Sequence, residues 1–243
     1  MSGLQIFNAH PALYWGEDSN FEQPVLSIYR ASTVEGRPIG ITSVFGRRFE
    51  TTGVLGWSTV NGRPVQRAFP GWITIPSTQD LATGRVWHFF FAWLFVVNGA
   101  VYIGYSVVSR RFARELFPGG KEWRSIGRTV WDHLTLRFHR GAEHYNVIQQ
   151  LTYMLVILGF APLIVLTGLT MSPAVNAAIP WLADAFGGRQ SARTIHFIMT
   201  WLFVLFALVH VLMVLASGLF NNMRAMISGW YAVAGGTAGH EDT

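Results

Sequence analysis

Three long runs without a charged residue divide the chain. They are residues 86–109, 144–183 and 194–223, and the segments between them mix polar with apolar positions. A helix needs about 20 apolar residues to cross the roughly 30 Å hydrocarbon core of a bilayer. The runs meet that length, so the pattern predicts three membrane-spanning helices, at about residues 86–109, 147–170 and 194–218.

Shorter signals refine this picture. Pro162 lies inside the second predicted span, where a missing backbone N–H predicts a kink. Before the first span, residues 1–85 have no long apolar run, and glycine and proline interrupt them repeatedly. Asn61 and Gly62 stand between short apolar segments, which is a typical hairpin-turn signal. We therefore expect loops and short strands in this region.

The charges suggest an orientation. All 31 charged residues fall in the 149 residues outside the three runs, about 21% of them, so the extramembrane parts have nearly soluble composition. A chain with 51% apolar residues is neither disordered nor a nucleic-acid-binding domain. Residues 110–146 carry eight basic residues against four acidic ones. By the positive-inside rule, we expect this loop and the tail at 221–243 to be cytoplasmic and residues 1–85 to be periplasmic. The membrane domain is then predicted at residues 86–220.

Cysteine is absent from the sequence. This excludes disulfides, thiolate metal sites, iron–sulfur clusters and haem attached covalently through cysteine. Redox chemistry would therefore need a cofactor held by other side chains, and the eight histidines are the candidates.

Three histidines fall inside the predicted spans. His196 and His210 are 14 residues apart, which places them on the same side of one helix, about 21 Å apart along its axis. His88 opens the first span at the same depth as His196, because both spans run from outside to inside. Two imidazoles that face each other at one depth can bind an iron porphyrin from both sides. We predict a non-covalent b-type haem between His88 and His196, whereas the alternative is that each histidine only packs between helices.

The remaining histidines give weaker signals. His210 suits a haem near the inner side, but the first two spans offer it no partner. His144 has a similar depth but precedes its apolar run, so we expect it to lie at the headgroup level. The others are expected on the surface: His10, His133, His139 and His240.

The chain resembles the bacterial cytochrome b561 and nickel–iron hydrogenase b-type cytochrome family, in particular members described as thiosulfate reductase cytochrome b subunits. The resemblance covers about residues 1–220 and includes the His196 to His210 spacing. It also rests on four motifs: Ser2–Pro11, Arg85–Phe90, Tyr145–Tyr153 and Thr167–Pro173. It implies a haem-binding helical bundle, an all-α membrane protein of the bacterial inner membrane with a long periplasmic N-terminal loop region.

Family members have four spans, and the first carries a histidine that pairs with the later histidine of the last span. The resemblance therefore implies two haems b: an outer one ligated by His88 and His196, and an inner one ligated by His210 and a histidine absent here. We expect three spans of a four-span fold, in a sequence that begins at an internal methionine, so that one haem site is complete.

The resemblance also implies a quinone site near the inner haem, where Asn146 and Gln149 match polar residues of related subunits. Alternatively, Asn146 caps the second span and Gln149 reaches the headgroup region. The expected function is electron transfer between the quinone pool and a periplasmic molybdopterin oxidoreductase or hydrogenase. The alternatives are a haem-free membrane anchor or assembly subunit, and a stand-alone quinol oxidoreductase that acts on a small oxidant.

Overall fold

The computed structural model describes residues 1–60, 62–109 and 147–216. The chain divides into two compact units. One comprises residues 1–105 and 161–199, and the other residues 106–160 and 200–243. The predicted cytoplasmic loop at 110–146 and the tail at 221–243 lie outside the described residues, and the division into periplasmic, membrane and cytoplasmic parts stays a prediction.

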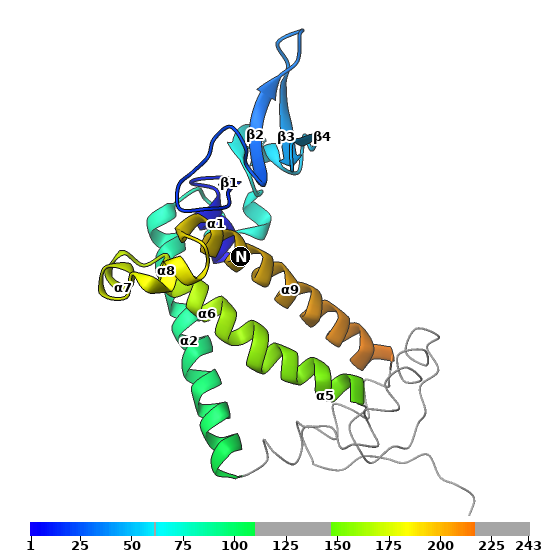
Figure 1. Cartoon of the computed structure of the whole chain (residues 1–243). Coiled ribbons are helices and arrows are strands. Elements are labelled where there is room, and N and C mark those ends of the chain that lie inside the picture. The colour runs from blue at the N-terminus through cyan, green and yellow to red at the C-terminus, as the bar shows by residue number, and fades with distance from the viewer. Residues whose placement is uncertain (61, 110–146, 217–243) are drawn as a thin grey trace, which may run out of the picture. The chain divides into compact units, whose positions relative to one another are not determined.

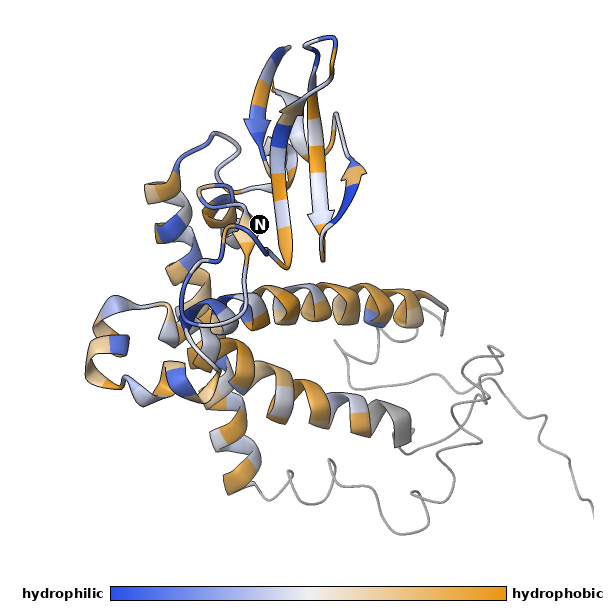
Figure 2. Ribbon diagram, turned by 45° about the horizontal axis from the view of Figure 1, so that its top comes forward, coloured by the Kyte–Doolittle hydropathy of each residue, from blue (hydrophilic) through white to orange (hydrophobic). Residues whose placement is uncertain are grey.

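Three stretches of helix are long and apolar enough to cross a membrane, as predicted. They are Leu81–Val108, Leu151–Thr170 and Arg189–Leu215, and almost no residue in the apolar 18-residue window of each is buried within the protein. Helix α2 spans Leu81–Val108 and helix α9 spans Arg189–Ala216. Apolar residues cover these helices nearly all round (Figure 2), which is the pattern of a surface that faces lipid. The prediction of three apolar helices of membrane-spanning length is confirmed.

Helix α2 begins before the charge-free run because a capping residue stands at Asp80. Its carboxylate accepts hydrogen bonds from the Thr83 backbone N–H at 3.1 Å and the Thr83 hydroxyl at 2.6 Å. A side chain at this position satisfies an N–H group that the first turn leaves without a helical partner. These hydrogen bonds from Thr83 lower the pKa of the Asp80 carboxyl.

The second apolar run is not one regular helix. It consists of α5 (Val147–Met154), a π-helical segment at Leu155–Phe160, and α6 (Ala161–Thr170). The π-helical segment ends two residues before Pro162, the residue that predicted a kink. A π-helical turn widens the spacing of backbone hydrogen bonds, so the irregularity falls where the proline removes a donor.

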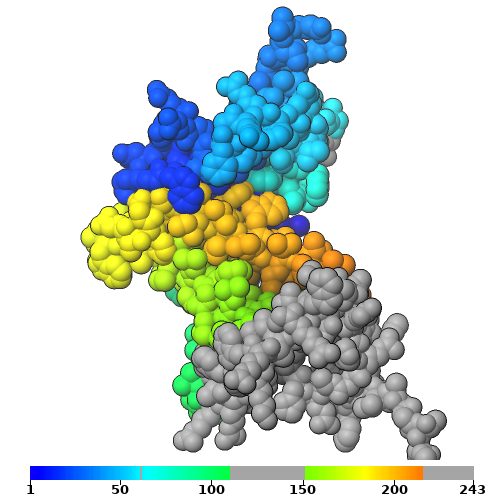
Figure 3. Space-filling view, turned by 45° about the vertical axis from the view of Figure 1, so that its right-hand side comes forward, coloured from blue at the N-terminus to red at the C-terminus, as the bar shows by residue number. Residues whose placement is uncertain are grey.

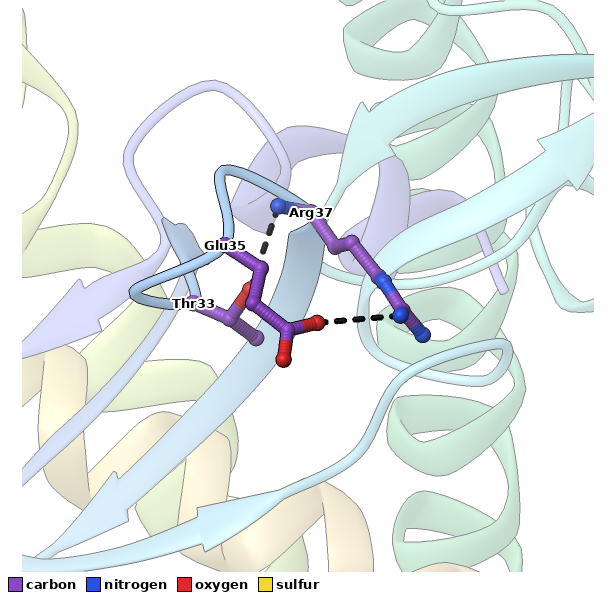
Figure 4. Close-up of polar contacts among 3 residues, drawn as sticks. All are labelled: Thr33, Glu35 and Arg37. Carbon is purple, nitrogen blue, oxygen red and sulfur yellow. Dashed lines mark hydrogen bonds and ion pairs between the residues drawn. The ribbon is translucent and has the colours of Figure 1, made fainter.

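The N-terminal region corrects the prediction of an all-α protein with an N-terminal loop region. A four-stranded antiparallel sheet has the order β1-β2-β3-β4, with strands β1 (Ala12–Leu13), β2 (Leu26–Ser32), β3 (Pro38–Val44) and β4 (Arg47–Glu50). Short connections join β2 to β3 and β3 to β4, so that neighbouring strands pair antiparallel (Figure 1). At the β2–β3 turn the Arg37 N–H donates to the Thr33 hydroxyl at 3.1 Å, and Arg37 pairs with Glu35 at 2.9 Å (Figure 4).

The predicted hairpin is confirmed by its two strands and Gly62, whereas Asn61 lies outside the described residues. Strands β5 (Gly56–Val60) and β6 (Arg63–Arg67) pair antiparallel, with Val60 opposite Arg63. Gly62 has a φ of +76°, a value that glycine adopts without strain and that a two-residue hairpin turn requires. A short 3-10 helix at Gly71–Ile73 then leads towards α2.

A short helix that the apolar pattern did not predict joins this region to α9. Helix α1 spans Ser2–Phe7, and its buried Leu4 and Phe7 pack with residues of the sheet region in one apolar core. The ring centre of Phe7 lies 5.5 Å from that of Phe69 and 4.9 Å from that of Phe197 on α9. The N-terminal segment is therefore packed against the start of the last membrane helix.

Hydrogen bonds from a distant loop cap the start of α9. The N–H groups of Gln190 and Ser191 donate to the Gly16 carbonyl, each at 3.1 Å, and the Arg189 N–H donates to Glu17 at 3.2 Å. Gly188 has a φ of +106°, and a side chain there would lie 2.5 Å from the Gly16 backbone, so this approach requires glycine. The N-terminal segment in blue touches the yellow segment that precedes α9, which contains α7 (Pro173–Ala178) and α8 (Trp181–Ala185) (Figure 3).

Candidate functional site

His88 and His196 lie together in the first unit. His88 is two turns into α2, and His196 is two turns into α9. Both side chains are half-buried. Their ring centres are 6.1 Å apart, with 72° between the ring planes. The structure thus brings together the two residues that the sequence predicts as ligands of the outer haem.

This spacing fits two ligands of one metal ion. A bond between a metal ion and an imidazole nitrogen is about 2 Å long, so two imidazoles on opposite sides of one ion have ring centres roughly 6 Å apart. Within the described residues no group of three or more His, Cys, Asp or Glu side chains could hold a metal ion. A pair of neutral imidazoles matches the donor set of an iron porphyrin, whose macrocycle supplies the other four nitrogens.

Helix α6 fixes the tautomer of the neutral His196 ring. Its Nδ1 atom lies 3.0 Å from the Ile164 carbonyl oxygen. A carbonyl oxygen only accepts, so Nδ1 carries the proton and donates it in this hydrogen bond. In the neutral ring Nε2 is then the nitrogen with the lone pair that binds a metal.

Thr167 supports the same nitrogen. This fully buried residue donates its hydroxyl hydrogen to the Leu163 carbonyl at 2.7 Å, and its oxygen lies 3.2 Å from His196 Nδ1. Because the hydroxyl hydrogen is engaged with Leu163, the oxygen is available to accept from the imidazole. Thr167 and the Ile164 carbonyl therefore hold the ring orientation together.

Two glycines provide room beside the imidazoles. A side-chain carbon added at Gly168 would lie 3.3 Å from His196 Cε1, closer than an ordinary contact. One added at Gly3 of α1 would lie 3.6 Å from His88 Cε1 and Nδ1. Helix α6 thus packs against one ring of the pair, and α1 against the other.

His210 lies in the second unit, in different surroundings. Its ring centre is 5.8 Å from that of Phe206 and 6.3 Å from that of Tyr153 on α5. Within the described part of this unit no other histidine is present. Its role as a ligand of a second haem stays a prediction.

The predicted quinone residues are not placed. Asn146 lies outside the described residues, as do His133, His139, His144 and His240. Gln149 belongs to α5, of which the backbone is described at that position. Both assignments stay predictions.

The prediction that His10 is a surface residue is wrong. The ring is half-buried between Tyr14 and Phe21, at centre distances of 5.7 and 6.0 Å. Its backbone carbonyl accepts a hydrogen bond from Arg193 of α9, and its Nε2 atom is buried without a hydrogen-bond partner. Burial, and secondarily the charge of Arg193, lower the pKa of His10. A terminal position in the sequence gave no signal of this packing.

Sequence reasoning missed the residues that support the ligands. The pair Thr167 and Gly168 was part of the family resemblance, but its contact with His196 depends on how α6 and α9 meet. Gly3 was likewise part of a matching motif, and its place beside His88 depends on the unpredicted helix α1. Contacts of this kind follow from packing between elements distant in sequence, which periodicity does not report.

A facing pair of histidines on two apolar helices defines a class of membrane protein that binds haem without covalent attachment. Comparison with known proteins agrees: the profile of the prokaryotic cytochrome b561 family matches residues 41–229, and the chain belongs to this family. It is therefore a multi-pass membrane protein and a b-type cytochrome that transfers electrons.

A relative in Azospira oryzae has the name "Putative protein-methionine-sulfoxide reductase subunit YedZ1". The two sequences are 34% identical over 162 residues, which cover 65% of this chain and 78% of the relative. No solved structure matches the chain.

Proposed function

We propose that this chain is the membrane subunit that transfers electrons between the quinone pool and a periplasmic oxidoreductase. The observation that carries the proposal is the His88–His196 pair, with ring centres 6.1 Å apart and with His196 oriented by the Ile164 carbonyl. Packing histidines need no such facing partner. A pair held in this way is suited to bind a haem b as axial ligands.

Each part of the site then has a task. His88 and His196 would bind the iron through neutral imidazole nitrogens, and bound haem supplies one-electron chemistry. Ile164 and Thr167 keep the proton of His196 on Nδ1, so that Nε2 remains the ligand atom. The apolar faces of α2 and α9 exclude water from the pair.

The relative named above suggests the kind of partner. Its name describes a subunit of a protein-methionine-sulfoxide reductase, and the family resemblance points to molybdopterin enzymes, so we propose a periplasmic reductase of that type. Electrons would then flow outwards. A quinol loses two electrons and two protons, and the partner uses two electrons and two protons to convert a sulfoxide into a thioether and water.

The orientation and the quinone site complete the proposal. The positive-inside rule places the basic 110–146 loop in the cytoplasm, and His88 and His196 at the periplasmic side. Asn146 and Gln149 would bind the quinone head near the cytoplasmic side, where His210 would ligate an inner haem. These assignments are supported by the sequence and the family resemblance.

Purified full-length protein tests the proposal. We expect a non-covalent b-type haem that becomes reduced when a quinol analogue is added, and that a periplasmic reductase of the proposed type reoxidises. A properly expressed protein without haem would refute the proposal and favour an anchor or assembly subunit. A protein that holds haem and reduces a small oxidant without any partner would favour the stand-alone enzyme.

A further inference from the structure

A buried arginine contacts helix α1, the helix that packs against His88. Arg67, the last residue of β6, is only 3% exposed. Its guanidinium donates to the Ser77 carbonyl, to Gln5 Oε1 at 2.9 Å and to the Thr74 hydroxyl at 2.9 Å. All three acceptors are uncharged.

An arginine buried without a carboxylate is unusual. Removing a guanidinium from water costs several kcal/mol, and neutral acceptors compensate only partly. Within the described residues the recorded ion pair joins Arg37 to Glu35, and no carboxylate contacts Arg67. Because arginine remains charged at any physiological pH, the site keeps a positive charge that needs an anion.

Two hydrogen-bond donors in this cluster also lack an acceptor. Arg67 Nε and Gln5 Nε2 are both buried without a hydrogen-bond partner. Gln5 is 1% exposed, and its oxygen already accepts from Arg67. Buried donors almost always have a partner, so two in one cluster indicate a missing acceptor. A carboxylate has two acceptor oxygens and the charge that Arg67 requires.

The cluster adjoins His88 through helix α1. Gly3 of α1 lies beside the His88 ring, and Gln5 lies against Gly84 of α2, where an added side-chain carbon would be 2.7 Å from Gln5 Cγ. Gly84 precedes His88 by one helical turn, about 6 Å along the axis. Gln5 therefore lies about one turn from His88, towards the start of α2, and Arg67 donates a hydrogen bond to it.

We propose that Arg67 and Gln5 bind a carboxylate group of the haem that His88 and His196 hold. The inference rests on the proposed ligation of haem by His88 and His196. It adds the residues that would recognise the edge of the haem that carries its carboxylates. Haem b carries two flexible carboxylate arms on one edge of its macrocycle. An arm that reaches one turn beyond His88 would supply the missing anion and accept from the two open donors.

Haem and its dimethyl ester, in which both carboxylates are blocked, distinguish this role from a structural one. We would prepare the full-length protein without haem in detergent and titrate it with each compound, following the absorbance of the bound form. The wild-type protein should bind the ester at least about tenfold more weakly than haem, because a charge-assisted hydrogen bond is lost. Arg67→Gln should bind haem more weakly than the wild type does, and should have a much smaller preference for haem over the ester.

Two matched variants control for the fold. Arg63→Gln removes an exposed arginine from the same strand and should discriminate like the wild type. Thr74→Val removes a neutral acceptor of Arg67 but leaves its charge, so discrimination should persist. If Arg67→Gln folds poorly, Arg67→Lys decides: a variant that binds haem with a reduced preference over the ester supports the proposal.

The proposal is overturned if Arg67→Gln, or Arg67→Lys in its place, prefers haem over the ester as strongly as the wild type does. It is also overturned if the wild type binds both compounds equally well. A wild-type protein that binds neither compound contradicts the proposed function itself, and that outcome is distinct from both.

Discussion

Helix α9 carries two histidines whose surroundings differ. His196 faces His88 and is anchored through Nδ1 to the Ile164 carbonyl. His210, 14 residues further along the same helix, lies among the rings of Phe206 and Tyr153. The residue type and the helix are the same, so the two histidines differ in their surroundings alone. The surroundings of His196, a facing imidazole and a fixed tautomer, are those that support a ligand role.

Substitution of a proposed ligand should have the largest effect and should separate His196 from His210 most clearly. We expect His88→Ala or His196→Ala to abolish the b-type signal of the outer haem, because one imidazole alone leaves the iron without its second axial ligand. His210→Ala should retain that signal. Reduced-minus-oxidised absorbance spectra of purified protein measure the effect, and an unchanged outer haem in His196→Ala would contradict the ligand assignment.

A larger side chain beside His196 should have the next largest effect. Gly168→Val would push against His196 Cε1, which already lies 3.3 Å from a single added carbon. We expect it to lose most of the outer haem, measured as haem per protein after purification. Gly104→Val is the control, because an added carbon at Gly104 of α2 meets no atom within 4 Å. Equal haem contents in the two variants would show that α6 does not constrain the ring.

Removing the hydroxyl that supports His196 should have a smaller effect. Thr167→Val leaves the Ile164 carbonyl as an acceptor but removes the contact at 3.2 Å. A neutral hydrogen bond contributes about 1 kcal/mol, so haem dissociation should accelerate roughly threefold to tenfold. Transfer of haem to an acceptor protein measures the rate. Thr167→Ser should behave like the wild type. Equal dissociation rates for the valine and serine variants would show that the hydroxyl does not stabilise haem binding.

The smallest effect concerns His10, a half-buried histidine that is not a proposed ligand. Its pKa is lowered from 6.5, so below that value the unfolded chain binds a proton more readily than the folded chain. The stability of the N-terminal segment should therefore fall as the pH drops below about 6.5. Above that pH the neutral His10 makes its full contribution to stability. Hydrogen exchange of residues 1–17 at pH 7.5 and 5.5 measures this change. His10→Asn should show a smaller loss of protection, and an equal loss would exclude His10 as the cause.

Sequence predicted the membrane helices and the ligand pair for physical reasons. A charge-free run of sufficient length is typical of a membrane helix. His88 and His196 were predicted to face each other because they lie at the same depth on two spans. The sequence also predicted the hairpin at Gly62, because the turn requires a specific residue type. It predicted short strands in the N-terminal region but not their pairing into a four-stranded sheet, because their periodicity is weak. It missed helix α1, which is too short to show an apolar face.

The supporting groups could not be predicted in the same way. The Ile164 carbonyl has no signature in the sequence, since every residue carries a backbone oxygen. Arg67 looked like one of several arginines in a polar segment, and only packing shows that it is buried beside Gln5. The surroundings of a ligand are assembled from α1, β6 and α6, and they become visible when those elements meet.

The central claim is that His88 and His196 together bind one haem. Near-infrared magnetic circular dichroism of the oxidised His210→Ala variant tests it most directly, because the spectrum identifies the axial ligands of the haem that remains. The account predicts a low-spin haem with two histidine ligands. A high-spin haem with one histidine ligand, or a variant with no haem, would contradict it.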